Sequence, residues 1–319
     1  MTRLAKEGGV NLSVTWKLLK TTVSKWSDDH VPRLGAALAY YTVFSLVPVL
    51  LIMIAITGLV FGQEAAQGQV INQIGGLVGE KSAQAIEGML ENARKPSSGV
   101  IAAIVGVITL LFGASGLFGQ LQDALNTIWG VKPKPGRGIL GILKDRFLSF
   151  MAVLGTGFLL LVSLIVSAGL AALGQVFKHW LPGPELLLQV INFVVSFGVI
   201  TLLFAMMYKI LPDVKLAWND VWIGAGVTAL LFTLGKFLLG LYLGKSDIGS
   251  TYGAAGSLVI ILFWVYYSSQ ILLFGAEFTA IYANQYGSRI KPAENAMPVS
   301  EASRAAQGLS QTASGSGIR

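Results

Sequence analysis

Long runs of apolar residues constrain this chain more than any other feature of its sequence. Six of them reach the length of about 20 residues that a helix needs to cross the hydrocarbon core of a bilayer. They cover the approximate ranges 34–62, 100–121, 147–177, 186–211, 221–243 and 254–283. Only 12% of the residues are charged, which is too few for the surface of a water-soluble protein. The sequence therefore predicts an all-α, polytopic membrane protein with six transmembrane helices.

The distribution of positive charge predicts the orientation of these helices. Most of the 23 Lys and Arg residues lie on one side of the predicted membrane. They occupy the N-terminal segment, the connections 122–146 and 209–217, and the C-terminal tail. Because cytoplasmic loops are enriched in Lys and Arg, we expect both termini in the cytoplasm. Orientation also accounts for the net charge of +7, so membrane lipids are the expected partners and nucleic acid is not.

Three segments outside the predicted spans have distinct characters: one on each side of the membrane domain (residues 34–285) and one, the cap, within it. In residues 1–33, apolar residues recur every three or four positions between residues 10 and 26. This pattern predicts a short amphipathic helix, lying either on the cytoplasmic surface or against the protein's own core. Residues 63–98 are too long for a turn and predict a small helical extracytoplasmic cap. Residues 286–319 are rich in small and polar residues and predict a disordered cytoplasmic tail.

Polar side chains in the spans are the first candidates for function, because they are costly in hydrocarbon. Gln120, Asp123 and Asn126 are spaced three residues apart and are predicted to share a helical face. Glu277 is expected at a similar depth, near the cytoplasmic end of the last span. Together these four residues predict a polar vestibule that opens to the cytoplasm. Electrostatic pairing that only fixes the helix packing is the alternative.

Lys236 is a candidate intramembrane cation, predicted roughly 10 Å below the outer end of the fifth span. It could bind an anionic group, or it could extend its ammonium to the interface. The chain contains no Cys and two His, His30 and His179, which excludes thiolate sites and a histidine-rich metal centre. No metal, cofactor or catalytic residue is predicted, and the chain is not expected to be an enzyme.

Four segments together resemble the YihY/virulence factor BrkB family of bacterial membrane proteins, formerly labelled ribonuclease BN. They are RLGAALAYYTVFSLVP, LQDALNTIW, YKILPDVKLAWNDVWIGA and YGAAGSLVIILFWVYYSSQILLFGAEFTAIY, in this order between residues 33 and 282. The resemblance implies a six-helix protein of the bacterial cytoplasmic (inner) membrane. It implies no catalytic role for any residue. The motif positions are Tyr40, Tyr41, Ser45, Pro48, Asn126, Trp129, Pro212, Gly275 and Glu277.

The leading hypothesis for function is transport or flipping of an amphipathic or lipid-related molecule of the cell envelope. It is motivated by the polar vestibule, by Lys236 and by the kink expected at Pro48. A non-transporting scaffold, or an envelope-stress or virulence-associated component, is the alternative. A tRNA-processing ribonuclease is disfavoured, because metal-dependent RNA cleavage needs clustered His and carboxylate ligands. The substrate stays unknown, and small residues in the spans would permit a homo-oligomer.

Overall fold

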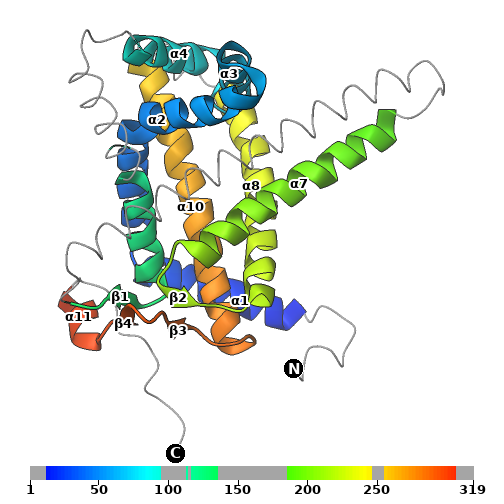
Figure 1. Ribbon diagram of the computed structural model, residues 1–319. Helices are drawn as coiled ribbons and strands as arrows, with labels where there is room; N and C mark the ends of the chain where they lie inside the picture. The colour runs from blue at the N-terminus through cyan, green and yellow to red at the C-terminus, as the bar shows by residue number, and fades with distance from the viewer. Residues whose placement is uncertain (1–11, 95–112, 114–115, 136–184, 246–254, 307–319) are drawn as a thin grey trace, which may run out of the picture.

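The computed structural model describes residues 12–94, 113, 116–135, 185–245 and 255–306. In these residues the protein is a bundle of long helices with short helices at one end and small strand pairs at the other (Figure 1). The long helices are α2 (Val31–Phe61), α7 (Glu185–Ile210), α8 (Trp218–Lys245) and α10 (Gly256–Gln285). Residues 116–128 are also helical and belong to the same bundle. We call the two ends of this bundle the cap end, which carries α3 (Gln63–Val78) and α4 (Glu80–Arg94), and the basal end, which carries the strands.

The chain is an all-α membrane protein, with four helices in its described part that are long and apolar enough to cross a membrane. The candidate spans are Val31–Leu59, Phe193–Ile210, Trp218–Tyr242 and Gly256–Gln285. They coincide with four of the six predicted spans. The predicted span 147–177 lies outside the described residues, and the span 100–121 is described only near its end.

Helix α2 is bent, and Figure 1 shows its C-terminal part crossing over the other helices. Pro48 lies inside this helix and has no N–H to donate to the carbonyl of Phe44, which is the cause expected from the sequence. Next to it, Ser45 Oγ donates a hydrogen bond of 2.5 Å to the carbonyl of Gly113. A Cβ at Gly113 would lie 2.9 Å from Pro48 Cγ, so the absence of a side chain there lets the two segments meet. Of the motif residues, Pro48 therefore bends α2 and Ser45 links it to the segment at Gly113.

Helices α8 and α10 cross closely, because each places a glycine opposite a threonine of the other. A Cβ added at Gly224 would collide with the side chain of Thr279, and one added at Gly275 would collide with that of Thr228. The hydroxyls of Thr228 and Thr279 donate to the carbonyls of Gly224 and Gly275 in their own helices, at 2.7 Å and 2.6 Å. Small residues allow such close approach in membrane proteins. The motif residue Gly275 is thus a packing residue.

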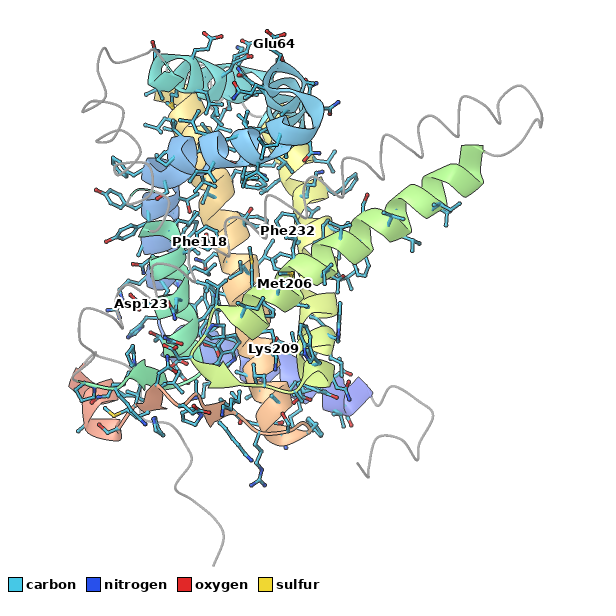
Figure 2. The ribbon with its side chains drawn as sticks, viewed as in Figure 1. Glu64, Phe118, Asp123, Met206, Lys209 and Phe232 are labelled. Carbon is cyan, nitrogen blue, oxygen red and sulfur yellow. The ribbon has the colours of Figure 1, made fainter. Side chains whose placement is uncertain are left out.

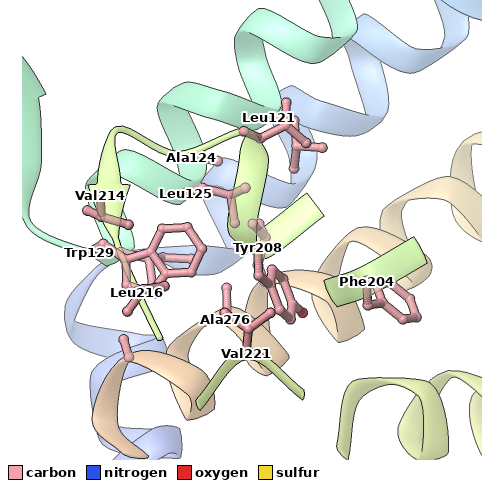
Figure 3. Packing of buried hydrophobic residues seen from close by; sticks show 14 of the residues in the cluster. Leu121, Ala124, Leu125, Trp129, Phe204, Tyr208, Val214, Leu216, Val221 and Ala276 are labelled. Carbon is pink, nitrogen blue, oxygen red and sulfur yellow. The ribbon is translucent and has the colours of Figure 1, made fainter. Parts of the chain in front are cut away.

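The largest buried cluster joins the helices near the basal end (Figure 3). The rings of Trp129 and Tyr208 meet edge to face with their centroids 6.1 Å apart. Tyr208 also donates a hydrogen bond of 2.7 Å from its hydroxyl to the carbonyl of Leu272. Pro212 is buried just beyond the end of α7, where a proline cannot continue the helix. This cluster holds the elements that carry the polar residues of the basal end.

The cap end is built from consecutive parts of the chain. Gly62 and Gly79 have φ values of 83° and 87°, a conformation that glycine adopts without strain, and they turn the chain from α2 into α3 and from α3 into α4. Ile86 and Leu90 of α4 are buried against Ile54 of α2 in a separate apolar cluster. The predicted cap is therefore helical through residue 94.

Helix α1 (Leu12–Asp28) lies across the basal end (Figure 1). It corresponds to the amphipathic helix predicted between residues 10 and 26. Leu18 is buried against Phe278 and Ile281 of α10, whereas Trp16 is 72% exposed. The apolar stripe therefore packs partly on the protein's own core and leaves one large aromatic side chain uncovered.

The C-terminal segment is ordered through Ala306, and the prediction of a disordered tail from residue 286 onward does not describe residues 286–306. Two antiparallel strand pairs and a short helix hold this segment against the basal end. They are β1 (Val131–Pro133) with β4 (Ala296–Pro298), β2 (Val214–Lys215) with β3 (Lys291–Pro292), and α11 (Glu301–Ala306). The order comes from pairing with distant parts of the chain, which local composition does not reveal. We call residues 286–306 the tail segment; residues 307–319 lie outside the described chain.

Candidate functional site

A cavity of about 350 Å³ lies between five helical segments at the middle of the bundle. Its walls include Leu38 of α2, Phe118 of the helix 116–128, Phe204 of α7, Phe232 of α8 and Leu272 of α10. Figure 2 shows Phe118 and Phe232 at similar height on the two sides of α10. We call this space the apolar cavity. It is large enough for part of a small ligand and suits hydrocarbon better than polar groups.

Two of the three hydroxyl side chains that line the apolar cavity, those of Thr42 and Ser269, are hydrogen-bonded within their own helices. Thr42 donates to the carbonyl of Leu38 at 2.7 Å, and Ser269 donates to the carbonyl of Val265 at 2.8 Å. The walls are therefore largely apolar, because a Thr or Ser side chain whose hydroxyl is hydrogen-bonded within its helix presents mainly carbon atoms to the cavity.

A polar network lies below the apolar cavity, toward the basal end, and is centred on Asp213. Asn126 Nδ2 donates to Asp213 Oδ2 at 3.1 Å, and the backbone N–H of Asp213 donates to Asn126 Oδ1 at 2.9 Å. Asn295 Nδ2 donates to Asp213 Oδ1 at 3.0 Å. One buried carboxylate therefore ties together the helix 116–128, the turn after α7 and the tail segment.

A second cavity of about 210 Å³ adjoins this network; we call it the basal cavity. Asp123, Asn126, Lys132 and Arg304 are among the residues that line it. The Lys132 ammonium donates to Ser303 Oγ at 2.9 Å, so the tail segment forms part of its wall. Figure 2 shows Asp123 well below Phe118 on the same helix. The basal cavity offers side chains of both charges to a ligand.

Three charged side chains are buried together beside the basal cavity. Arg304 of the tail segment donates from Nη2 to Asp29 Oδ1, and the two residues are 4% and 2% exposed. Glu277 of α10 is 1% exposed and lies close enough to Asp29 for the two carboxyl groups to act on each other. Lys25, which is half-buried on α1, also acts on Glu277 electrostatically. Buried charges are costly unless they compensate one another, so this group requires each of its members.

The structure brings together most, but not all, of the predicted vestibule. Asp123 and Asn126 both line the basal cavity, and Arg304 connects that cavity to the group that contains Glu277. Gln120 is half-buried one turn nearer the cap end and lines neither cavity. A spacing of three residues advances a helix by 60° less than a full turn, so Gln120 and Asn126 face directions roughly 120° apart.

The other predicted residues lie away from both cavities. Lys236 is exposed on α8 beside the exposed side chains of Phe237 and Leu238, a setting that fits extension of its ammonium toward an interface. Tyr40 and Tyr41 are also exposed, on α2, with their ring centroids 5.8 Å apart. The two tyrosines thus offer surface aromatic groups rather than a binding pocket.

Four charged residues of the basal end are not among the candidates predicted from the sequence: Asp29, Asp213, Asp220 and Arg304. Asp220 Oδ2 accepts hydrogen bonds from the backbone N–H and the hydroxyl of Ser288, at 2.9 Å and 2.7 Å. All four lie in turns, at a helix start or in the tail segment, outside the apolar interiors where candidates were sought. Asp213 and Asp220 carried a signal, since both lie within one family motif and Asp213 directly follows the motif position Pro212.

Within the part of the chain that the structure describes, no three His, Cys, Asp or Glu side chains come together as a metal site would require. Asp29 and Glu277 form a pair, and the guanidinium of Arg304 takes the place beside Asp29 that a bound cation would take. The arrangement can bind and orient a ligand, exclude water and carry charge.

Known proteins resemble this chain over most of its length. The family model described as "Virulence factor BrkB" matches residues 22–300. A UPF0761 membrane protein of Verminephrobacter eiseniae is 31% identical over 273 residues, which are 83% of this chain and 62% of the relative. A UPF0761 membrane protein of Pseudomonas aeruginosa is 30% identical over 259 residues, 79% of this chain and 59% of the relative. The chain thus spans less than two thirds of the length of either relative. No solved structure matches it.

Proposed function

We propose that this chain, which belongs to the virulence factor BrkB family of membrane proteins, transports or flips an amphipathic or lipid-related molecule of the cell envelope. One observation carries the proposal: the helix 116–128 borders the apolar cavity and, nearer the basal end, the polar basal cavity. Leu121 lines the first cavity and Asp123 lines the second, only two residues later. An amphipathic molecule has this same order of apolar and polar parts.

The two cavities divide the proposed substrate between them. The apolar cavity receives its hydrocarbon part, since burial of apolar surface is favourable and requires no directional partner. The basal cavity receives its polar head, which Asn126, Lys132 and Asp123 can orient by hydrogen bonds and charge. On α10 the same change occurs between Leu272, in the wall of the apolar cavity, and Glu277, in the buried charged group.

The proposal includes an orientation in the membrane. We place the basal end in the cytoplasm and the cap end outside the inner membrane, so that both termini are cytoplasmic. Support comes from Lys132, Lys134 and Lys215, which lie at the basal end near the strands, because Lys and Arg are enriched on the cytoplasmic side. In this proposal the partners are the substrate and membrane lipids, and the chain performs no enzymatic step and binds no nucleic acid.

Reconstitution into lipid vesicles tests the transport proposal. The purified chain is inserted into vesicles that contain fluorescent lipid analogues, and movement between the leaflets is followed by a membrane-impermeant quencher. Ser268→Phe places a bulky ring in the wall of the apolar cavity and is expected to lower the rate about tenfold or more. Leu258→Phe, at a 39% exposed position of the same helix, is the control and should keep the wild-type rate.

The same experiment separates transport from the scaffold alternative. Equal rates for Ser268→Phe and Leu258→Phe, in a preparation with measurable wild-type activity, would contradict the role of the apolar cavity. A scaffold that acts through its cap predicts instead that cells tolerate Ser268→Phe but not Met89→Asp, a change at an exposed position of α4. Cell phenotypes of these two variants therefore distinguish the two functions.

A further inference from the structure

We propose that Asp29 and Glu277 form a proton-binding site and that Arg304 of the tail segment competes with the proton for this site. The inference adds a coupling ion to the proposed function. Only that coupling role rests on transport, because binding of the proton depends on the buried group alone.

The contact between the two carboxyl groups requires a proton. Asp29 and Glu277 are 2% and 1% exposed, and their carboxyl groups act on each other beside the guanidinium of Arg304, which pairs with Asp29. An ionised carboxylate only accepts hydrogen bonds, so two of them in contact repel each other. When one of the two groups is protonated, its hydroxyl donates to the other, and two neighbouring carboxyls then hold one proton between them.

The charges around the pair also balance when one proton is bound. The charged groups that act on Glu277 are Asp29 from the turn before α2, Lys25 from α1 and Arg304 from α11. Arg304 is buried and pairs with Asp29, which leaves Glu277 with the half-buried Lys25, whose charge is screened by solvent. Two ionised carboxylates would leave a buried negative charge poorly compensated. One proton makes the group of Asp29, Glu277 and Arg304 neutral.

Buried polar atoms without a partner mark where a proton can be exchanged. Within the described chain, Glu277 Oε1 is buried and accepts no hydrogen bond. Gln270 lies seven residues earlier on the same face of α10, packed against Gly35 of α2. Its side-chain amide nitrogen and oxygen are also buried and make no hydrogen bond. Such atoms are the ones that a water molecule or a transferred proton satisfies. They extend the site from the basal end toward the middle of the bundle.

Arg304 can leave the pair without unfolding the bundle. Besides Arg304, the tail segment is held by strands of two or three residues, by the hydrogen bond from Asn295 to Asp213 and by contacts at the surface, all of which stay in place when Arg304 leaves. One of the surface contacts is the ion pair between Lys215 and Glu294, at 2.9 Å, with the side chains 61% and 92% exposed. Exposed pairs of this kind contribute little to stability. Release of Arg304 would open the wall of the basal cavity, which this residue lines.

The proton and the guanidinium are therefore linked. Each is a cation that stabilises the same pair of carboxyls, so binding of one weakens the hold of the other, and the coupling is reciprocal. Protonation favours release of Arg304, and departure of Arg304 favours retention of the proton. In the transport cycle, this linkage would couple opening of the basal cavity to uptake of a proton from the aqueous phase on that side.

Infrared difference spectroscopy of the full chain in lipid nanodiscs tests the inference directly. A protonated carboxyl has a carbonyl band that an ionised one lacks, and uniform ¹³C labelling of glutamate shifts the band if Glu277 carries the proton. We expect such a buried band in the wild type at neutral pH, reduced by Glu277→Gln and Asp29→Asn. In Arg304→Met the band should disappear at a pH about one unit or more higher than in the wild type, since a nearby cation favours the ionised form of a carboxyl. Glu294→Gln, an exposed acid of the same segment, is the control and should change nothing.

The outcomes separate this inference from the proposed function. Absence of a buried carboxyl band in the wild type, or a titration that Arg304→Met leaves unchanged, would overturn the proton site even if lipid movement is normal. Presence of the band and of the shift, in a chain that moves no lipid, would support the site and remove its role in transport. Labelling of the wild type decides the first point even where a variant fails to fold.

Discussion

The cap end and the basal end close the same bundle in different ways. The cap end consists of α3 and α4, which follow α2 directly and bury an apolar cluster around Leu90. The basal end joins segments from across the chain, and its Asp29–Arg304 pair spans 275 positions of sequence. It is held by buried polar groups rather than by apolar contact alone. The cap end therefore depends on apolar packing, whereas the basal end depends on buried charges that compensate one another, as is common at functional sites.

Of the substitutions considered, removal of the Arg304 side chain should destabilise the basal end most. Arg304→Ala leaves the carboxyls of Asp29 and Glu277 buried without their cation, and breaking such a pair costs about 3–5 kcal/mol of unfolding free energy. The loss should shrink at acidic pH, where protons neutralise the carboxyls. Unfolding in detergent at two pH values measures both effects. Lys291→Ala, an exposed cation of the same segment, serves as the control, and an equal loss in both variants would contradict the account.

Truncation of Leu90 should damage the cap end alone. The side chain is 0% exposed, and Leu90→Ala is expected to cost about 2–5 kcal/mol through lost burial and a residual cavity. Because α4 packs on α3, on the end of α2 and on the start of α10, the increase in hydrogen exchange should be confined to these elements. Met89→Ala, at a 43% exposed neighbour, should have little effect. Faster exchange in the tail segment would show that the two ends are not independent.

Loss of Asn126 should loosen the basal end by a smaller amount. Asn126→Ala removes two hydrogen bonds to Asp213 and leaves a buried carboxylate and a backbone N–H less satisfied, at a cost of about 1–3 kcal/mol. Gln120→Ala on the same helix should be nearly neutral, because that residue lines neither cavity. Thermal unfolding of the two variants ranks them. Equal destabilisation by the two substitutions would instead support the predicted vestibule, in which Gln120 and Asn126 act together.

The exposed pair between Lys215 and Glu294 should have the smallest effect. Glu294→Gln removes its charge, and exposed pairs contribute about 0–1 kcal/mol. Any difference should vanish at high salt, which screens exposed charges. A large loss that persists at high salt would mean that surface contacts hold the tail segment more firmly than the buried Arg304 does.

The sequence predicted the parts of the molecule whose cause is local. The spans follow from unbroken apolar runs, the bend of α2 from Pro48, and the cap from a connection too long for a turn. The pairing of Asp29 with Arg304 has no such local cause, since either residue alone resembles an ordinary surface charge. The tail segment was assigned to disorder for the same reason, because its strands are stabilised only by residues 131–133 and 214–215.

The candidate site was predicted only in part. Burial of a carboxyl in a span identified Glu277, and helical spacing identified Asn126. The same spacing rule wrongly grouped Gln120 with them, because the face of a helix drifts over six residues. Asp213 and Arg304 could not be assigned a role from the sequence, since that role exists only once distant segments meet.

An experimental map of the protein in lipid nanodiscs would show whether one amphipathic molecule occupies both cavities. We expect elongated density in the apolar cavity, next to Phe118 and Phe232, that continues into the basal cavity beside Asn126 and Lys132. Side chains that fill the apolar cavity completely, or density that lies only on the outside of the helices, would contradict this expectation.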